Sequence, residues 1–386
     1  MNRGKLELIF SQPHQAFFAF GIVNATIFML VFTLSYKGIV TLTASANFFH
    51  SFSLIFAVFT PFFLGFLLTT FPRFSQTIAL EKSIYTTNFA LLFLGILLFL
   101  IGSFISNVLI YFGVFFVFAS LIYTMVVFYQ IYKISPMPDL YDQKWIMIGF
   151  ASGVVSCFLF FVGFLSNSET ILSLAKLIAI YLFLTITALS VGQRMIPFFS
   201  HVMVEKNKKL LPITFSLFSA FIIFEVFNLK IGFIFLLLLS LYLAREIYSW
   251  KLPYKNSQSI LWILHLGLFW LPISLFISSF ASFIELIFER DFIYVGLHLV
   301  MLGFLTTLMI GFGTRVTLGH SGNQMVIDKT TKALFYLTPI VVITRAIYSF
   351  SGLNILFDLS VLLWLVLFIS WSVKYLPVVL FGKKLN

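Results

Sequence analysis

Twelve continuously apolar segments of about 20 residues each constrain this chain more than any other feature. Their length suits a membrane-spanning helix, and their lack of polar alternation argues against the strands of a β-barrel. Hydrophobic residues make up 61% of the chain and charged residues 10%, whereas a soluble domain carries about 25% charged residues. No soluble fold of 386 residues can bury so much apolar surface. The sequence therefore predicts an all-α, polytopic transmembrane helical bundle.

The twelve predicted spans follow one another with short connections. We expect them at residues 16–35, 47–71, 87–105, 108–131, 145–166, 171–193, 210–227, 230–248, 259–280, 292–314, 333–350 and 354–373. The shortest connections lie around Asn107, at 228–230 and at 351–353, and they predict three tight helical hairpins. No segment has the composition of an extramembrane domain. Residues 1–386 are thus predicted to form a single integral membrane domain of twelve transmembrane helices.

The charges of the loops predict the orientation of the chain. With the N-terminus in the cytoplasm, 19 of the 24 Lys and Arg residues lie at the cytoplasmic ends of the predicted spans. Only Lys37, Lys230 and Arg290 lie on the other side, and Lys176 and Arg345 lie within spans. Because basic residues concentrate in cytoplasmic loops, this asymmetry predicts twelve spans with both termini in the cytoplasm.

Several classes of function lack support in the sequence. The net charge of +11 reflects loop orientation in a membrane protein, so the expected partner is the lipid bilayer and not nucleic acid. The single cysteine, Cys157, excludes an intramolecular disulfide, and the N-terminus lacks a signal-peptide pattern, so we expect the first span to be retained. No HExxH, CxxC, CxxCH, Walker A or GxGxxG motif is present, which leaves zinc-protease, covalent haem and nucleotide sites without support.

The histidines sort into two depths on this topology. His50 lies about 5 Å from the outer start of its span and His298 about 9 Å from the outer start of its own. His14, His265 and His320 lie toward the cytoplasmic face. Two imidazoles at one depth on different helices could be the axial ligands of a haem, and three that converge at one face could hold copper. Each of these histidines could instead be an ordinary interfacial or hydrogen-bonded residue. For His201, which lies in a basic loop, that interpretation is preferred.

Other polar groups extend the candidate site. Arg73, Arg194 and Arg315 each end a helix directed at the cytoplasm, where they could clamp an anion such as haem propionates or could simply anchor the helix end. Pro72 and Pro197 are expected to mark helix ends beside two of these arginines.

Four ionisable residues fall inside spans, where such groups often mark functional sites. For Arg345 and Asp358, on neighbouring antiparallel spans, a structural ion pair is favoured over a proton relay. Glu225 lies near an outer helix end and can reach water, and Lys176 completes the set.

Six motifs together resemble the NnrS family. They are Pro13-His14 with Phe17-Phe18, Phe49-His50, GFLLTTFPRF at 65–74, GQRMIPFF at 192–199, WILHLGLFWLP at 262–272, and HLVMLGFLTTLMIGFGTRVTLGHSG at 298–322. The sequence departs from the family pattern at Gln15 and Asn323, where an arginine is common, and at 51–53, where a second histidine and a glutamate are common.

This resemblance implies a twelve-helix protein of the bacterial inner membrane that contains haem and copper and acts in nitric oxide metabolism or nitrosative-stress protection. From the depths of the histidines and the positions of the arginines, we expect His50, His298, Arg73, Arg194 and Arg315 as cofactor-binding residues and His14, His265 and His320 as metal ligands. The resemblance supports metal or haem at these histidines and leaves open which of them bind haem and which bind copper. Two other classes stay open: a multi-spanning transporter, and a non-catalytic assembly or sensing partner of denitrification enzymes. Whether the protein is an enzyme is left open.

Overall fold

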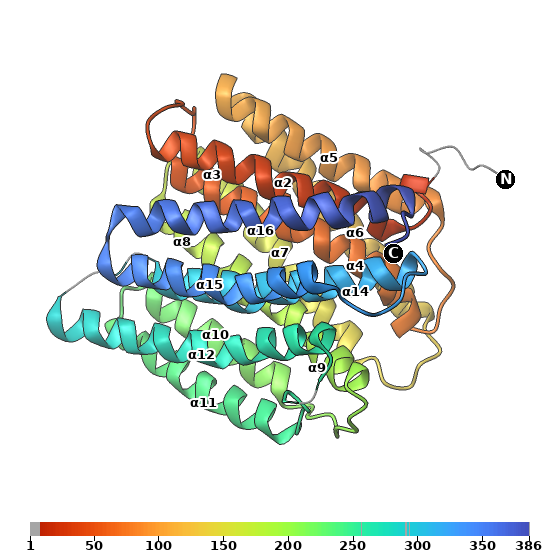
Figure 1. The fold of residues 1–386 in the computed structure, drawn as a ribbon. Helices are drawn as coiled ribbons and strands as arrows, with labels where there is room; N and C mark the ends of the chain where they lie inside the picture. The colour runs from red at the N-terminus through yellow and green to blue at the C-terminus, as the bar shows by residue number, and fades with distance from the viewer. Residues whose placement is uncertain (1–7, 256, 290–291, 293, 386) are drawn as a thin grey trace. The chain divides into compact units, whose positions relative to one another are not determined.

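The computed structural model describes residues 8–255, 257–289, 292 and 294–385, and every regular element in this part is a helix (Figure 1). The all-α prediction is therefore confirmed. Arg3, Lys5 and Arg290, which were counted among the loop charges, lie outside the described residues. The elements in chain order are α2 (Pro13–Tyr36), α3 (Ala46–Phe52), η1 (Ser53–Phe59), α4 (Thr60–Phe74), α5 (Lys82–Ile105), α6 (Asn107–Ile134), α7 (Tyr141–Leu165), α8 (Glu169–Leu177), η2 (Ile178–Thr185), α9 (Ile186–Phe199), α10 (Leu210–Val226), η3 (Lys230–Gly232), α11 (Phe233–Ser249), α12 (Ser259–Phe288), α13 (Val295–His298), η4 (Leu299–Thr306), α14 (Thr307–His320), α15 (Lys329–Ser351) and α16 (Asn354–Phe381).

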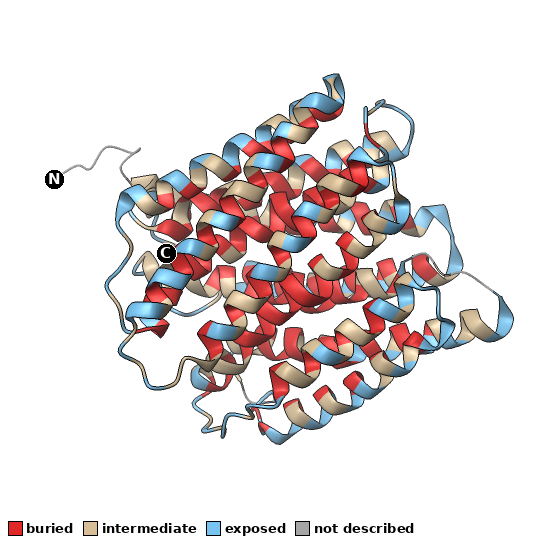
Figure 2. Cartoon of the chain, turned by 180° about the vertical axis from the view of Figure 1, so that it is seen from behind, coloured by how far each residue is buried: buried red, intermediate tan, exposed pale blue. Residues whose placement is uncertain are grey.

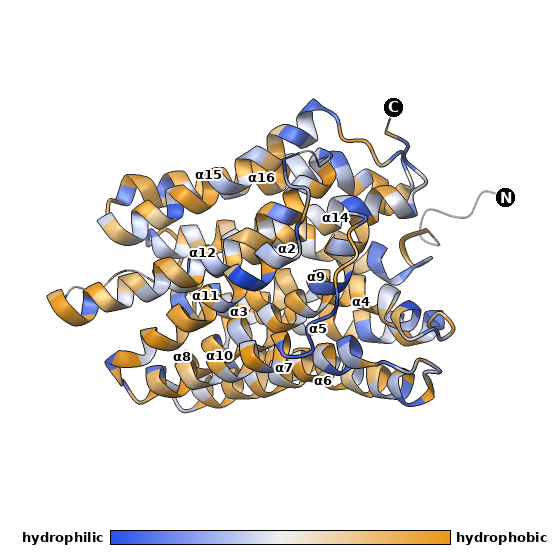
Figure 3. Cartoon of the chain, turned by 90° about the horizontal axis from the view of Figure 1, so that it is seen from below, coloured by the Kyte–Doolittle hydropathy of each residue, from blue (hydrophilic) through white to orange (hydrophobic). Residues whose placement is uncertain are grey.

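Joined end to end, these elements give eleven helices that are long and apolar enough to cross a membrane. Helix α10 is apolar too, but its 17 residues make it shorter than the others. Hydrophobic residues predominate along the helices (Figure 3). The protein is thus a multi-pass membrane protein. Twelve crossings and the sidedness of the loops stay predictions.

The three predicted hairpins are confirmed, and several helices run further than expected. Ser106 alone separates α5 from α6, and Gly352, with φ of +70°, turns the chain between α15 and α16. The expectation that Pro72 and Pro197 mark helix ends was wrong, because α4 and α9 continue for two residues beyond them. A proline in a last turn removes one helical hydrogen bond, and the helix can tolerate that loss so near its end.

The described chain divides into two compact units. The first comprises residues 1–179, 320–323 and 372–386, and the second comprises 180–319 and 324–371. Buried residues lie on the sides of helices that face other helices, and exposed residues lie on the opposite sides (Figure 2). Exposed aromatic side chains such as Phe112 and Phe115 on α6 are suited to contact with lipid.

In the first unit, α5 and α6 pack with their backbones unusually close. A Cβ added to Gly95 would lie 2.8 Å from the Gly113 carbonyl oxygen, and one added to Gly113 would lie 2.6 Å from the Phe99 nitrogen. The buried Asn88 amide donates to the Thr124 hydroxyl at 2.7 Å and accepts from the Ser120 hydroxyl at 2.5 Å. Small residues and polar cross-links of this kind join helices in membranes, where lipid provides no hydrophobic drive for helix association.

Three spans share one distortion, a wide π-helical turn. The segments Ser53–Phe59, Ile178–Thr185 and Leu299–Thr306 lie within the spans Ala46–Phe74, Glu169–Phe199 and Val295–His320, which at 94%, 78% and 78% buried are the most buried of the eleven. In each, a threonine hydroxyl donates to the carbonyl five residues earlier: Thr60 to Ile55, Thr185 to Ile180 and Thr306 to Met301. Wide turns of this type occur often at functional sites.

Candidate functional site

Two histidines that are 306 positions apart in the sequence meet in the first unit. His14 is the second residue of α2, and His320 is the last residue of α14. Their ring centroids are 4.4 Å apart, with an angle of 51° between the planes. The His14 side chain is 3% exposed, and its Nδ1 atom is buried without a hydrogen-bond partner. An unsatisfied buried nitrogen is unfavourable, so this atom is suited to binding another group.

Gln12 holds His320 in one orientation. The Nδ1 atom of His320 lies 2.7 Å from Gln12 Oε1. Because an amide oxygen only accepts, we assign the proton to Nδ1 and the lone pair to Nε2 of His320. Gln15, which stands where an arginine is common in the resemblance noted above, accepts from the Gln12 backbone N–H at 3.1 Å and so caps α2. A carbonyl partner on one imidazole nitrogen commonly orients the other toward a metal.

In the part of the chain that the structure describes, Arg73 in the last turn of α4 is a charged neighbour of the pair of imidazoles and lies within electrostatic reach of both rings. Among the described residues, no three His, Cys, Asp or Glu side chains form a group that could hold a metal ion. The His14–His320 pair by itself offers two imidazole donors, on rings whose centroids are 4.4 Å apart.

His265 lies in the second unit and has a different environment. It is on α12, its side chain is 1% exposed, and its Nε2 atom is 2.8 Å from the Ser200 hydroxyl at the end of α9. Its Nδ1 atom is buried without a hydrogen-bond partner. Of the three histidines predicted near the cytoplasmic face, the structure thus brings His14 and His320 together, and the place of His265 beside them stays a prediction.

His298, also in the second unit, has an arginine partner that the sequence did not reveal. Its Nδ1 atom lies 2.9 Å from the Tyr294 carbonyl oxygen, and Arg345 Nη2 lies 3.1 Å from its Nε2 atom. Nδ1 therefore carries the proton. Arg345 Nη2 is also 3.3 Å from Nδ1, so it lies at nearly the same distance from both ring nitrogens and is not aligned with the Nε2 lone pair. Arg345 is buried, donates to Ser349 at 2.9 Å and stacks on the Tyr348 ring at 4.6 Å. Its expected ion pair with Asp358 stays a prediction.

His50 lies in the first unit, where its ring stacks on Phe32 with a centroid separation of 4.0 Å. It precedes the wide turn Ser53–Phe59, just as His298 precedes Leu299–Thr306. Both predicted outer histidines are therefore at the start of a π-helical segment. Because they belong to different units, their pairing around one haem stays a prediction.

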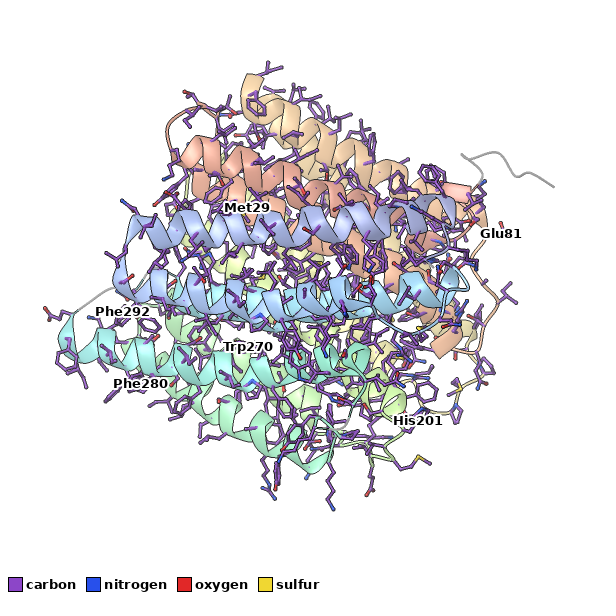
Figure 4. All side chains as sticks on the ribbon, in the orientation of Figure 1. Met29, Glu81, His201, Trp270, Phe280 and Phe292 are labelled. Carbon is purple, nitrogen blue, oxygen red and sulfur yellow. The ribbon has the colours of Figure 1, made fainter. Side chains whose placement is uncertain are left out.

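The three arginines do not share one environment. Arg73 belongs to the first unit, and Arg194 and Arg315 belong to the second. The Arg315 guanidinium lies 3.8 Å from the centre of the Phe199 ring, which links α14 to the end of α9. A common anion clamp stays a prediction. His201 is exposed in the loop after α9, at the edge of the helical part (Figure 4), as expected for an ordinary loop histidine.

Sequence reasoning did not identify the side-chain partners of three histidines. The partners are Gln12 for His320, Ser200 for His265 and Arg345 for His298. Nothing in the spacing of these residues connects them, since each contact joins segments separated by many residues. The only usable signal was the position of Arg345 within an apolar span, and it suggested Asp358 as the partner. Hydrogen-bond partners of this kind depend on how helices are rotated against one another, which an apolar sequence specifies poorly.

A comparison with models of protein families gives a match over residues 8–381, to the family described as NnrS protein. The match covers nearly the whole chain, including all of the histidines discussed above. No curated protein matches the chain.

Proposed function

The chain belongs to the NnrS family, and on that premise we propose that it is a metal-containing protein of the bacterial inner membrane that acts in nitric oxide metabolism or protects the cell from nitrosative stress. In this proposal, copper binds at His14 and His320, and haem binds through His50 and His298. The observation that carries the proposal is the His14–His320 pair, in which the buried His14 and the half-buried His320 each have a nitrogen available to a metal.

The chemistry of the donors favours copper at this pair. Imidazole nitrogens bind zinc, copper, iron and nickel, but structural zinc takes four ligands. Monovalent copper accepts two ligands in a linear arrangement, which places the two imidazole centroids about 6 Å apart. The His14 and His320 rings, 4.4 Å apart in this structure, would therefore have to separate to bind it. The site is also reached by the positive charge of Arg73, which favours a cation of low charge over a divalent one. Bound copper would supply a redox-active centre. The protein would hold it through His14 and His320 and would fix the His320 ring through Gln12.

The geometry supports haem less than it supports copper. The proposal of haem rests on membership of the family and on the hydrogen-bond partners of His298. The Tyr294 carbonyl fixes the tautomer that leaves a lone pair on Nε2, the nitrogen that commonly ligates iron. Arg345 Nη2 lies 3.1 Å from that nitrogen and 3.3 Å from Nδ1 in this structure, so haem binding requires Arg345 to move aside. A bound haem would supply an iron centre for nitric oxide. Arg345, once displaced, is suited to pair with a haem propionate.

Metal analysis and an optical spectrum of the purified protein test the proposal together. We expect copper and a Soret band in the wild type. We expect His14→Ala and His320→Ala to lose copper and keep the Soret band, because the two sites use different histidines. His298→Ala should lose the Soret band and keep copper. His201→Ala is the matched control and should lose neither. A wild-type protein with neither copper nor haem absorbance would refute the proposal.

A transporter is the second candidate, because Lys176 and Arg345 are ionisable and buried within apolar spans. It predicts substrate flux in proteoliposomes that does not depend on any metal. Co-purification with a reductase, without flux and without bound metal, would instead favour an assembly or sensing partner.

A further inference from the structure

The C-terminal residues Lys383, Lys384 and Leu385 contact the loop that directly follows His320. The Lys384 ammonium donates to the carbonyl oxygens of Ser321 at 2.7 Å and Gly322 at 2.9 Å. Asn323 accepts from the Leu385 backbone N–H at 2.8 Å and donates to the Lys383 carbonyl at 3.3 Å. All of these residues belong to the first unit. We call residues 382–385 the strap and residues 321–323 the loop.

The chemistry of the loop suits these contacts. Helix α14 ends at His320, and the carbonyl groups at a helix C-terminus attract a cation. Gly322 has φ of +65°, which turns the chain there and presents two successive carbonyl groups to one ammonium. Asn323 carries a donor and an acceptor on one amide, so it can pair with the strap backbone in both directions. An arginine at position 323 would offer donors only.

The strap and Gln12 hold His320 from two sides. Gln12 binds the imidazole itself at 2.7 Å, while the strap binds the residues that come next in the chain. Near Gln12, the side chain of Leu8 lies 3.6 Å from the position that a Cβ would occupy on Gly382. The N-terminal segment, the loop and the strap therefore form one cluster around the end of α14.

We propose that the strap positions His320, and that strap closure and metal binding at His14 and His320 stabilise each other. This inference rests on the metal site proposed above. With the strap open, the loop is no longer held at Asn323 and at the carbonyls of Ser321 and Gly322, and the His320 ring samples more orientations. A metal that needs one of those orientations then binds more weakly, and by thermodynamic linkage it favours the closed strap to the same degree.

Two substitutions test the coupling in the full-length protein. Lys384→Met removes the ammonium contacts, and Asn323→Leu removes the two-way amide pairing. For each variant we expect the copper(I) affinity to fall on the order of tenfold, because the variant loses one charged hydrogen bond or two neutral ones. Competition with a chelator measures this affinity. In the wild type, copper(I) should slow hydrogen exchange at the Leu385 amide by a similar factor.

Lys383→Met is the matched control, because it removes the same charge one residue away while the strap uses only the Lys383 backbone carbonyl. It should bind copper(I) as the wild type does, or slightly more tightly because a positive charge is gone. If Lys384→Met also binds as tightly as the wild type, the strap does not position His320 and the inference is overturned.

Hydrogen exchange of the metal-free proteins shows whether a variant is correctly folded. In metal-free Lys384→Met, the Leu385 amide should exchange faster while the amides of α5 and α6 exchange as in the wild type. Unchanged exchange at Leu385 would also overturn the inference. These failures differ from failure of the proposed function, in which the wild type itself binds no copper(I).

Discussion

At the scale of single residues, the partner of each imidazole decides which nitrogen it offers. His320 donates from Nδ1 to Gln12, and His298 donates from Nδ1 to the Tyr294 carbonyl, so both present a lone pair on Nε2. The His320 ring lies 4.4 Å from the His14 ring, whereas the His298 ring has Arg345 Nη2 at 3.1 Å from Nε2 and 3.3 Å from Nδ1. Two histidines that look equivalent in the sequence therefore have different neighbours, an imidazole for one and a guanidinium group for the other.

Replacing Arg345 should expose the Nε2 atom of His298. In Arg345→Met, the guanidinium group no longer lies against the imidazole, so acylation of His298 by diethyl pyrocarbonate should be faster, on the order of tenfold for the loss of a charged contact of about 1.5 kcal/mol. Mass spectrometry of the modified peptides measures the rate at each histidine. The exposed His201 serves as the internal control and should react equally in both proteins. Equal rates at His298 would show that Arg345 does not guard this nitrogen.

At the scale of elements, the sequence predicted where the helices lie but not where they are distorted. Each predicted span has a helix at its place, because a segment of about 20 apolar residues can satisfy its backbone in lipid only as a helix. The three wide turns have no such signature, since their residues are as apolar as the rest of the spans. They depend on the Thr60, Thr185 and Thr306 hydroxyls, whose bonds to carbonyls five residues earlier form only in the folded helix.

The hairpin of α5 and α6 offers a test of packing at this scale. Gly95→Ala places a Cβ 2.8 Å from the Gly113 carbonyl oxygen, which is backbone and cannot rotate away. We expect the helices to separate and the free energy of unfolding to fall by about 1–3 kcal/mol, seen as a lower melting temperature in detergent. Gly192→Ala is the control, because its added Cβ would have no neighbour closer than 3.7 Å. Equal melting temperatures for both variants would contradict the close packing.

At the scale of the whole molecule, the two ends of the chain bear on the number of crossings. Leu8 lies beside Gly382, and the strap binds the loop after α14, so the first and last helices have ends in the same cluster of the first unit. Termini on one side of a membrane require an even number of crossings. We therefore expect α10 to cross together with the eleven longer helices.

Reporter fusions at the two termini test this expectation. A reporter that is active only in the cytoplasm should be active at both ends, and one that is active only outside should be inactive at both, as the loop charges also predict. A fusion within residues 227–229, after α10, provides the decisive comparison and should report the opposite side. Opposite results at the two termini would mean eleven crossings, with α10 lying outside the membrane or folded back within it.

The sequence alone determined the class of the protein, the place of each helix, the family and the histidines worth following. These depend on apolar length, loop charge and local motifs, which are written along the chain. Only the tertiary structure decided that His14 meets His320, that Gln12 and Arg345 set the imidazoles they touch, and that the strap reaches the loop at Asn323. Those contacts join residues far apart in the chain, and their geometry depends on how the helices rotate and pack against one another. Many apolar sequences allow nearly the same packing, so the sequence alone specifies that geometry poorly.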